Sequence, residues 1–367
     1  MSPKDLLEFQ PSLAEWFERV GQTERAHELR HEDNTRTERF RELLKVITIP
    51  CDVPMVVGAE ALREKSGPVA EYFESFGQEP CAIRLVPKRS GLPKLRSRGL
   101  FLNDCFKSWF LEQKISDPDY DAEIYRHSNN HAWSTIFVVG EQGVTGEIIA
   151  GQHNQLTSGE MKTSPYHFWY NFTDLSFVPA APPAAIDWVV KLLRFITIPE
   201  IAAREALQEK LKAKFYKNIL GGYFEAVVWD TGEIFFIDYN RLLGDTIQGG
   251  IGADQGAIES RGSWRGSRAQ GGVVRGIARV LKPEDLGTAI FNLGDVLVAF
   301  NTDVRFLPFM QKAGAIVTEQ GGILSHAAIV AREYKKPCLV GVAGLLQAVK
   351  NGDTVEVDAD RGIIKVL

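Results

Sequence analysis

Hydrophobic and polar positions along the chain change their spacing near residues 43, 242 and 272. Before residue 43, Leu, Phe and Trp recur at helical spacing through LLEFQPSLAEWFERV and are followed by mixed charges, which predicts a small helical lead-in over 1–42. From 43 to 241, short apolar runs such as CAIRLV, STIFVVG and EIFFIDY alternate with helical stretches such as AAIDWVVKLLRF and IPEIAAREALQEKLKAKFYKNI. This alternation predicts one α+β domain over 43–241.

A glycine-rich stretch separates this domain from a second one. Residues 242–271, LLGDTIQGGIGADQGAIESRGSWRGSRAQG, contain eight glycines and few apolar side chains, which is typical of a linker or hinge. An unstructured chain of this length spans on the order of 30 Å. We therefore expect the smaller domain over 272–367 to move relative to the first.

The smaller domain contains a histidine at a strand-to-helix turn. AIVTEQGG predicts a buried strand that runs into a glycine-rich turn, and AAIVAREYKK predicts a helix with Lys335 and Lys336 at its end and Pro337 just beyond. Ser325 can cap this helix, whose first amides and positive dipole end would face an anion on the imidazole of His326. The pattern predicts a site that holds a phosphoryl group.

A predicted hairpin in the larger domain brings polar side chains together. FEAVVWDTGEIFFIDYNR, 224–241, indicates two adjacent strands joined by the turn DTGE. Period-two alternation places Asp238 and Asn240 on one face of the second strand, and Glu225 can lie close by across the hairpin. Such hard oxygen ligands suit magnesium bound to substrate phosphates. The alternative is an ordinary hairpin with edge-strand charges.

Composition narrows the function classes. The chain has 367 residues, 44% of them hydrophobic, which is enough for two or three domains with cores of their own. A formal charge of -5 argues against a general nucleic-acid binder. A local basic stretch suits a polyphosphate ligand: Lys88, Arg89, Lys94, Arg96 and Arg98. No apolar run is long enough for a membrane span and the N-terminus lacks a signal core, so we expect a cytoplasmic protein.

The cysteines and histidines point to no further metal site. The four cysteines have no CxxC pair or zinc spacing and are expected to be free thiols without a disulfide framework: Cys51, Cys81, Cys105 and Cys338. His127 and His131 have i, i+4 spacing, but they span the turn-like SNN and no Glu follows the first histidine. We therefore do not expect zinc.

Residues 272–367 closely resemble a known domain, on the segments GVVRGIARVL, GDVLVAFNTDVRFLPFM, TEQGGILSHAAIVARE and NGDTVEVDADRGIIKVL. They are similar to the mobile phosphohistidine domain of phosphoenolpyruvate-utilising enzymes such as phosphoenolpyruvate synthase, pyruvate phosphate dikinase and rifampin phosphotransferase. The resemblance implies a small swivelling α/β domain in which His326 carries a phosphoryl group between two sites. It also implies a pocket shaped by Thr318, Glu319, Gly321, Gly322 and Ser325.

The hairpin resembles the end of an ATP-grasp domain, where a Glu on one strand and an acidic residue and an Asn on the next bind the magnesium ions of ATP. The resemblance implies Glu225, Asp238 and Asn240 as metal ligands and Arg241 near the phosphates. This sequence departs from the family in one respect, because the family arginine commonly follows two residues after the asparagine and Arg241 follows directly.

Two further segments resemble the strands that complete an ATP-grasp nucleotide cleft. PCAIRLVPKRSG, 80–91, is similar to the strand that offers a cation to the α- and β-phosphates; Arg84 matches the family arginine and Lys88 is the rival. YDAEIYRHSNN, 120–130, resembles the linker past the adenine ring, where backbone groups of Glu123, Ile124 and Tyr125 would read the base. Ordinary strand packing is the alternative for these three residues.

The two resemblances together imply an ATP- and magnesium-dependent phosphotransferase of dikinase type. Its phosphoryl group would pass from ATP through His326 to a small-molecule acceptor, with release of AMP and phosphate. Relatives carry an additional acceptor domain that does not follow here, so a separate subunit is expected to hold the acceptor, or a small acceptor to bind near one of the two domains. Two alternatives stay open: an ATP-dependent ligase with a phosphorylated intermediate, and a phosphocarrier that serves a partner protein.

Overall fold

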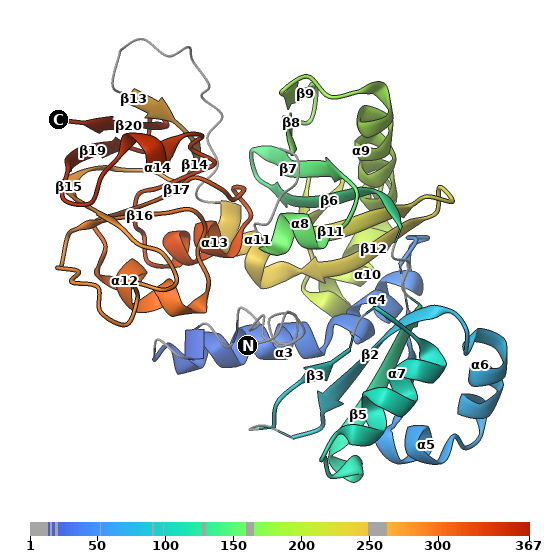
Figure 1. Cartoon of the computed structure of the whole chain (residues 1–367). Coiled ribbons are helices and arrows are strands. Elements are labelled where there is room, and N and C mark those ends of the chain that lie inside the picture. Colours follow the sequence, from blue (N-terminus) through green and yellow to red (C-terminus); the bar gives the residue numbers. More distant parts are fainter. Residues whose placement is uncertain are drawn as a thin grey trace.

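The computed structural model describes residues 14, 17–18, 21–51, 53–89, 92–97, 99–126, 130–158, 165–248 and 263–367. Two helices near the start, α3 (Thr23–Asn34) and α4 (Arg36–Leu44), agree with the predicted helical lead-in. Figure 1 shows them in blue, running beneath the C-terminal unit and then between the two sheets that follow. The lead-in therefore lies at the meeting point of the three sheets.

The first sheet has five strands in the order β1-β5-β2-β3, with β4 also paired to β2. Its strands are β1 (Met55–Gly58), β2 (Pro80–Pro87), β3 (Leu95–Arg96), β4 (Leu100–Phe101) and β5 (Tyr120–Arg126). Its helices are α5 (Ala59–Glu64), α6 (Pro68–Phe76), α7 (Leu102–Ser108), η1 (Phe110–Glu112) and η2 (Asp117–Asp119). The side chains of Leu62, Phe73, Ile83 and Ile124 pack into one core, which gives this unit its own apolar centre.

The second sheet has seven strands in the order β10-β11-β6-β7-β8-β9, with β12 paired to β11. Its strands are β6 (His131–Gly140), β7 (Gly143–Ala150), β8 (Tyr166–Tyr170), β9 (Leu175–Val178), β10 (Lys214–Tyr216), β11 (Ile219–Trp229) and β12 (Ile234–Asn240). Its helices are α8 (Asn154–Ser158), α9 (Pro183–Ile196), α10 (Ile201–Leu211) and α11 (Arg241–Gln248). The range 43–241 therefore contains two sheets.

The two faces of this sheet have different neighbours because side chains alternate along each strand. Phe224 and Phe137 point to the face where they pack with residues of α9 and α10 such as Val189 and Leu207. Tyr223 and the strand residues next to it on the other face pack with α11 and with the C-terminal unit. The second face is thus the one that meets the predicted phosphohistidine domain.

The C-terminal sheet has eight strands in the order β13-β20-β19-β15-β16-β17-β18-β14. Its strands are β13 (Ser263–Arg265), β14 (Ser267–Gln270), β15 (Val273–Val280), β16 (Val296–Ala299), β17 (Ala315–Thr318), β18 (Cys338–Val340), β19 (Thr354–Asp358) and β20 (Ile363–Val366). Its helices are η3 (Val304–Phe306), α12 (Leu307–Lys312), α13 (His326–Glu333) and α14 (Leu345–Ala348). β15, β16, β17 and β18 are parallel neighbours, which is typical of an α/β unit.

Three predicted boundaries need correction. Residues 249–262 of the predicted linker lie outside the described residues, but 241–248 form α11 and 263–270 form two strands of the C-terminal sheet. The helix predicted from 198 onward ends at Leu211, where Lys212 adopts a left-handed conformation, and Lys214–Tyr216 pair with β11. Glycine content predicted a linker and helical periodicity predicted a longer helix, but pairing with neighbouring strands determined the structure of residues 263–270 and of Lys214–Tyr216.

Two expectations about the whole chain have outcomes in the structure. All four cysteines are free, and Cys81, Cys105 and Cys338 are buried, as predicted. In the described part of the chain, no helix combines the length and the apolar character needed to cross a bilayer.

Candidate functional site

Five residues form one row across the face of the second sheet that meets the C-terminal unit. Strand register pairs Asp238 with Glu225, Glu225 with Ile136, Ile136 with Glu147 and Glu147 with His167. Members of such a row project to the same face. The predicted hairpin is confirmed, and it places the carboxylates of Glu225 and Asp238 at one end of a polar row.

The Glu225 and Asp238 carboxylates have opposite environments. Glu225 lies 2.8 Å from His153 Nε2 through one oxygen and accepts a hydrogen bond from the Tyr223 hydroxyl at 2.6 Å through the other. Burial opposes the charge of Glu225, but His153 and Tyr223 outweigh it and lower its pKa to about 2. Loss of hydration and repulsion from Glu225 raise the pKa of Asp238 to about 7. The pair therefore carries one negative charge readily, and it carries two negative charges only when a cation lies nearby.

One cation close to the pair comes from the lead-in, for which the sequence predicted no functional role. Arg36 of α4 is buried, donates to the Tyr125 hydroxyl at 2.6 Å and carries charge that acts to lower the pKa of Asp238. Thr37 donates to Glu123 at 2.6 Å. A sequence signal existed: Arg36, Arg39 and Leu43 share one helix face at positions i, i+3 and i+7. Arginines on an otherwise apolar face indicate buried charge partners.

The strand residues predicted for the nucleotide cleft fall into two groups. Arg84 lies with its guanidinium carbon 4.8 Å from the centre of the Tyr125 ring, whereas Lys88 pairs with Asp121 at 3.1 Å and is largely exposed. Strand β5 pairs with β1 on one side and with β2 on the other, so Glu123 and Ile124 have strand neighbours on both sides, whereas Tyr125 has one on the β2 side. A linker that reads a base needs free backbone groups. In this structure the side chains of Glu123 and Tyr125 face α4 instead, and Ile124 is in the core.

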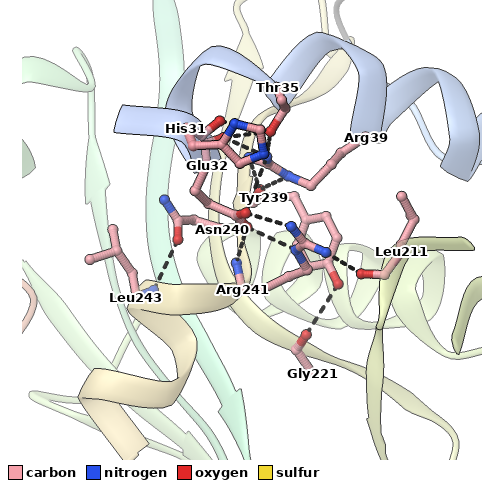
Figure 2. Close-up of polar contacts among 10 residues, drawn as sticks. All are labelled: His31, Glu32, Thr35, Arg39, Leu211, Gly221, Tyr239, Asn240, Arg241 and Leu243. Atoms are coloured by element: carbon pink, nitrogen blue, oxygen red, sulfur yellow. Dashed lines mark hydrogen bonds and ion pairs between the residues drawn. The ribbon is translucent and has the colours of Figure 1, made fainter. Parts of the chain in front are cut away.

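β12 ends at Asn240 and α11 begins at Arg241, and Figure 2 labels both residues. The Asn240 side-chain oxygen accepts the N–H of Leu243 at 2.9 Å, the bond expected of an N-cap. Arg241 donates to Glu32 of α3 through Nε at 2.9 Å and Nη2 at 2.5 Å, and also to the carbonyl of Leu211. These partners hold Arg241 against the lead-in, while the predicted role was contact with phosphates.

Glu32 organises this corner of the molecule. It is 97% buried and also receives the backbone N–H of Arg241, while Arg39 donates to the carbonyl of Tyr239 at 2.9 Å. The charges of Arg241 and Arg39 outweigh burial and lower the pKa of Glu32. Figure 2 shows the group between α3 and the end of β12. The network fixes the helical lead-in beside the Glu225 and Asp238 pair.

The predicted phosphohistidine loop has the local structure that its sequence indicates. β17 ends at Thr318, Gly321 has φ +125°, and Ser325 caps α13 by accepting the N–H of Ala328 at 3.4 Å. His326 is the first residue of α13. Glu319 accepts the N–H of Leu346 at 2.8 Å, so it tethers α14 to the loop. The hydroxyl of Thr318 is buried and has no hydrogen-bond partner among the described residues.

This loop rests on the polar row. Glu147 Oε1 accepts the backbone N–H of Ile323 at 2.7 Å and lies 3.3 Å from His167 Nδ1. Burial lowers the pKa of His167, but hydrogen bonding to Glu147 and its charge outweigh that effect and raise it. On the other side, Arg332 of α13 donates to the Ile323 carbonyl at 2.7 Å. Ile323 and Leu324 pack in the same apolar core as Ile136 and Ile149 of the second sheet.

Residues 291–362 match the family model described as the PEP-utilising enzyme mobile domain. The C-terminal unit is therefore similar to this mobile domain over residues 291–362. Over this region the chain is 44% identical across 101 residues to a probable phosphoenolpyruvate synthase of Staphylothermus marinus, covering 27% of this chain and 12% of that protein. It is 36% identical across 96 residues to a rifampicin phosphotransferase of Streptomyces sviceus, covering 26% and 11%. The chain thus spans about an eighth of the length of these curated relatives.

Solved structures also resemble parts of the chain. An NMR structure of Enzyme I is 31% identical, covering 22% of this chain and 33% of that one, with a TM-score of 0.20. A macrocyclase of Microcystis aeruginosa bound with its precursor peptide is 10% identical, covering 56% and 52%, with a TM-score of 0.27. Neither likeness is close enough to define a fold. The resemblance to the mobile domain therefore rests on sequence, and the two preceding sheets are described from their own geometry.

Proposed function

We propose that the chain is an ATP-dependent phosphotransferase of dikinase type in which His326 receives a phosphoryl group and passes it to an acceptor. One observation carries the proposal. The loop that precedes His326 contacts Glu147, which lies in the same row as Glu225 and Asp238, two strands from the first and three strands from the second. Neighbouring strands are about 4.8 Å apart, so these separations are roughly 10 Å and roughly 14 Å at the backbone. A polyphosphate bound at the carboxylate pair would extend along the row toward the loop.

The residues present suit a magnesium ion. In the described part of the chain, no cluster of three or more His, Cys, Asp and Glu side chains forms a complete metal site. Magnesium at nucleotide sites commonly takes one or two protein carboxylates and completes its shell with phosphates and water. Glu225 and Asp238 supply two such carboxylates, and Asn240 supplies an amide oxygen with a second lone pair. When bound, the ion would neutralise phosphate charge.

The protein's own groups contribute position and charge. Arg36 and Arg84 flank Tyr125 from two elements and offer positive charge to a polyphosphate. An imidazole nitrogen of neutral His326 attacks phosphorus and an N–P bond forms. The bridging P–O bond breaks, and its electron pair leaves on the oxygen of AMP after attack at the β-phosphorus, or of ADP after attack at the γ-phosphorus. In the dikinase route AMP departs, the histidine is pyrophosphorylated, and water releases phosphate. The remaining phosphoryl group then goes to the acceptor, which is a small molecule or is held by a partner subunit.

The test uses the purified chain with magnesium and ATP labelled at the β- or γ-phosphate. We expect acid-labile label on the protein, AMP among the products, and no label on a His326→Ala variant. Label retained by His326→Ala would refute the mechanism, and ADP as the product would replace the dikinase route by simple γ-phosphoryl transfer. Transfer of label only to a second protein would favour a phosphocarrier over an enzyme with a small-molecule acceptor.

A further inference from the structure

A buried carboxylate lies beneath the loop that precedes the carrier helix. The side chain of Glu147 is 99% buried, and a buried charge is costly unless hydrogen-bonding partners compensate for its lost hydration. Its partners are the Ile323 N–H of the mobile domain and the His167 ring of β8. We propose, building on the phosphotransfer function above, that Glu147 is a positioning residue that docks the phosphohistidine loop on the nucleotide-binding sheet for transfer from ATP.

Gly322 shows how closely the loop approaches this carboxylate. A Cβ atom at position 322 would lie 2.0 Å from Glu147 Oε2 and 2.2 Å from Oε1, far inside contact distance. The φ angle of Gly322 lies outside the left-handed region, so its backbone conformation does not require glycine. Glycine is needed there because the carboxylate occupies the space that a side chain would fill.

The bond to Glu147 is one of two hydrogen bonds that hold the backbone of Ile323. Glu147 takes the N–H of Ile323, and Arg332 donates to the carbonyl of the same residue. Burial lowers the pKa of Arg332 to about 10, while its attraction to Cys338 and to Glu147 acts in the opposite direction. The two bonds hold the peptide units before and after Ile323.

Apolar packing alone would leave the docked position less well defined. The interface core contains Ile136 and Ile149 of the sheet and Ile323, Leu324 and Ile329 of the mobile domain. Hydrophobic attraction scales with buried area and has no direction. A charge-assisted hydrogen bond requires a donor at a set distance and angle, so it selects one docked position. Phosphoryl transfer depends on such placement, since an error of about 1 Å can cost roughly 100-fold in rate.

The experiment compares Glu147→Ala, Gly322→Ala and the double variant with the wild-type chain. Three quantities are measured: hydrogen exchange at the Ile323 amide, the radius of gyration by small-angle scattering, and the single-turnover rate of label transfer from ATP. Glu147→Ala is expected to accelerate exchange and to slow labelling roughly 10- to 100-fold, with ATP affinity unchanged. Gly322→Ala is also expected to accelerate exchange at the Ile323 amide and to slow labelling, because its methyl group pushes the loop away from the carboxylate.

The double variant discriminates docking from unrelated damage. Removing the Glu147 carboxylate makes room for the methyl group, so Gly322→Ala with Glu147→Ala should label faster than Gly322→Ala alone. Glu147→Gln keeps a neutral acceptor and should retain more labelling than Glu147→Ala. The matched control is Glu141→Ala, which changes an exposed carboxylate in the β6–β7 turn and should behave as wild type.

Two outcomes would overturn the proposal. One is wild-type labelling and exchange in Glu147→Ala, and the other is a double variant no faster than Gly322→Ala. A wild-type chain that acquires no label would instead refute the phosphotransfer function, and the exchange and scattering measurements would then decide whether Glu147 docks the loop.

Discussion

Glu225 and Asp238 are direct cross-strand neighbours whose pKa values are shifted in opposite directions, to about 2 and about 7. Two carboxylates this close cannot both ionise without a compensating charge. The same pair therefore titrates in the apo protein, and under the proposed magnesium binding it would become fully ionised. Several measurable properties of the chain follow from this relationship.

Replacing Asp238 with Asn should stabilise the apo protein at pH 8. The pKa of Asp238 is raised in the folded state, so the native protein holds a proton that the unfolded chain releases above about pH 4. The free energy of unfolding therefore falls as the pH rises from about 4 to about 7. Asp238→Asn removes this loss, and we expect a gain on the order of 1–2 kcal/mol at pH 8 and little change near pH 4. Urea unfolding at both pH values measures it.

Magnesium should stabilise the wild-type chain more at pH 8 than at pH 6. At pH 6 the Asp238 carboxyl is mostly protonated, and a cation must displace that proton to bind. Thermal unfolding with and without millimolar Mg²⁺ measures the difference. Asp238→Asn should lose most of the magnesium effect and its pH dependence. Equal stabilisation of variant and wild type would place the ion elsewhere.

Docking of the mobile domain should weaken at alkaline pH. The pKa of His167 is raised in the folded state through Glu147, so its contribution is complete below about pH 6.5 and is lost as the pH rises through the raised value. The charge that acts on His167 is that of Glu147, and Glu147 in turn attracts Arg332 of α13. Scattering between pH 6 and 9 should show a growing radius of gyration, and His167→Gln should flatten that change. A wild-type radius independent of pH would contradict the prediction.

The bond between Arg241 and Glu32 should be a major contribution to stability. Glu32 is 97% buried and loses its main partner in Arg241→Ala, which we expect to lower the free energy of unfolding by about 3–5 kcal/mol. A double-mutant cycle with Glu32→Gln isolates the coupling between the two side chains. Arg30→Ala is the matched control, because Arg30 and Glu18 form an exposed pair that should contribute about 1 kcal/mol or less.

The side chain of Ser325 should stabilise the N-terminus of α13 by capping it. Its hydroxyl accepts the Ala328 N–H at 3.4 Å, a long bond, so Ser325→Ala should cost about 0.5–1 kcal/mol. Ser325→Thr keeps a capping oxygen and serves as the control. Thermal unfolding of the two variants checks that the threonine variant is the more stable. If it were no more stable than the alanine variant, the cap could not be the cause of the stability lost in Ser325→Ala.

Structural features that depend on residues close in sequence were predictable from the sequence. The Asp230 to Glu233 turn, the period-two face of Asp238 and the capped helix after Ser325 all depend on short-range spacing, and the structure has each of them. The mobile domain was predictable because its motif is long and contiguous. These features involve residues that are close in sequence or paired across one hairpin.

Features that depend on distant contacts were not predictable. Arg36 reaches Tyr125 across 89 positions, and Glu147 meets Ile323 across 176, so no local pattern announces either contact. The glycine-rich stretch predicted as a linker includes β14, because β18 supplies its hydrogen bonds from about 70 positions away. Lone residues such as Glu147 and His167 acquire significance only when the register of five strands places them in one row.

Helix α3 has a practical consequence for dividing the protein into fragments. Its Arg25 pairs with Glu333 of α13 at 3.0 Å, and its Glu32 pairs with Arg241 beside the second sheet. One helix therefore contacts both the second sheet and the C-terminal unit, and Figure 1 shows its place beneath that unit. A fragment that starts at residue 45 would keep all three sheets and His326 yet lose this bridge, so truncation from the N-terminus should disturb the second sheet and the C-terminal unit together.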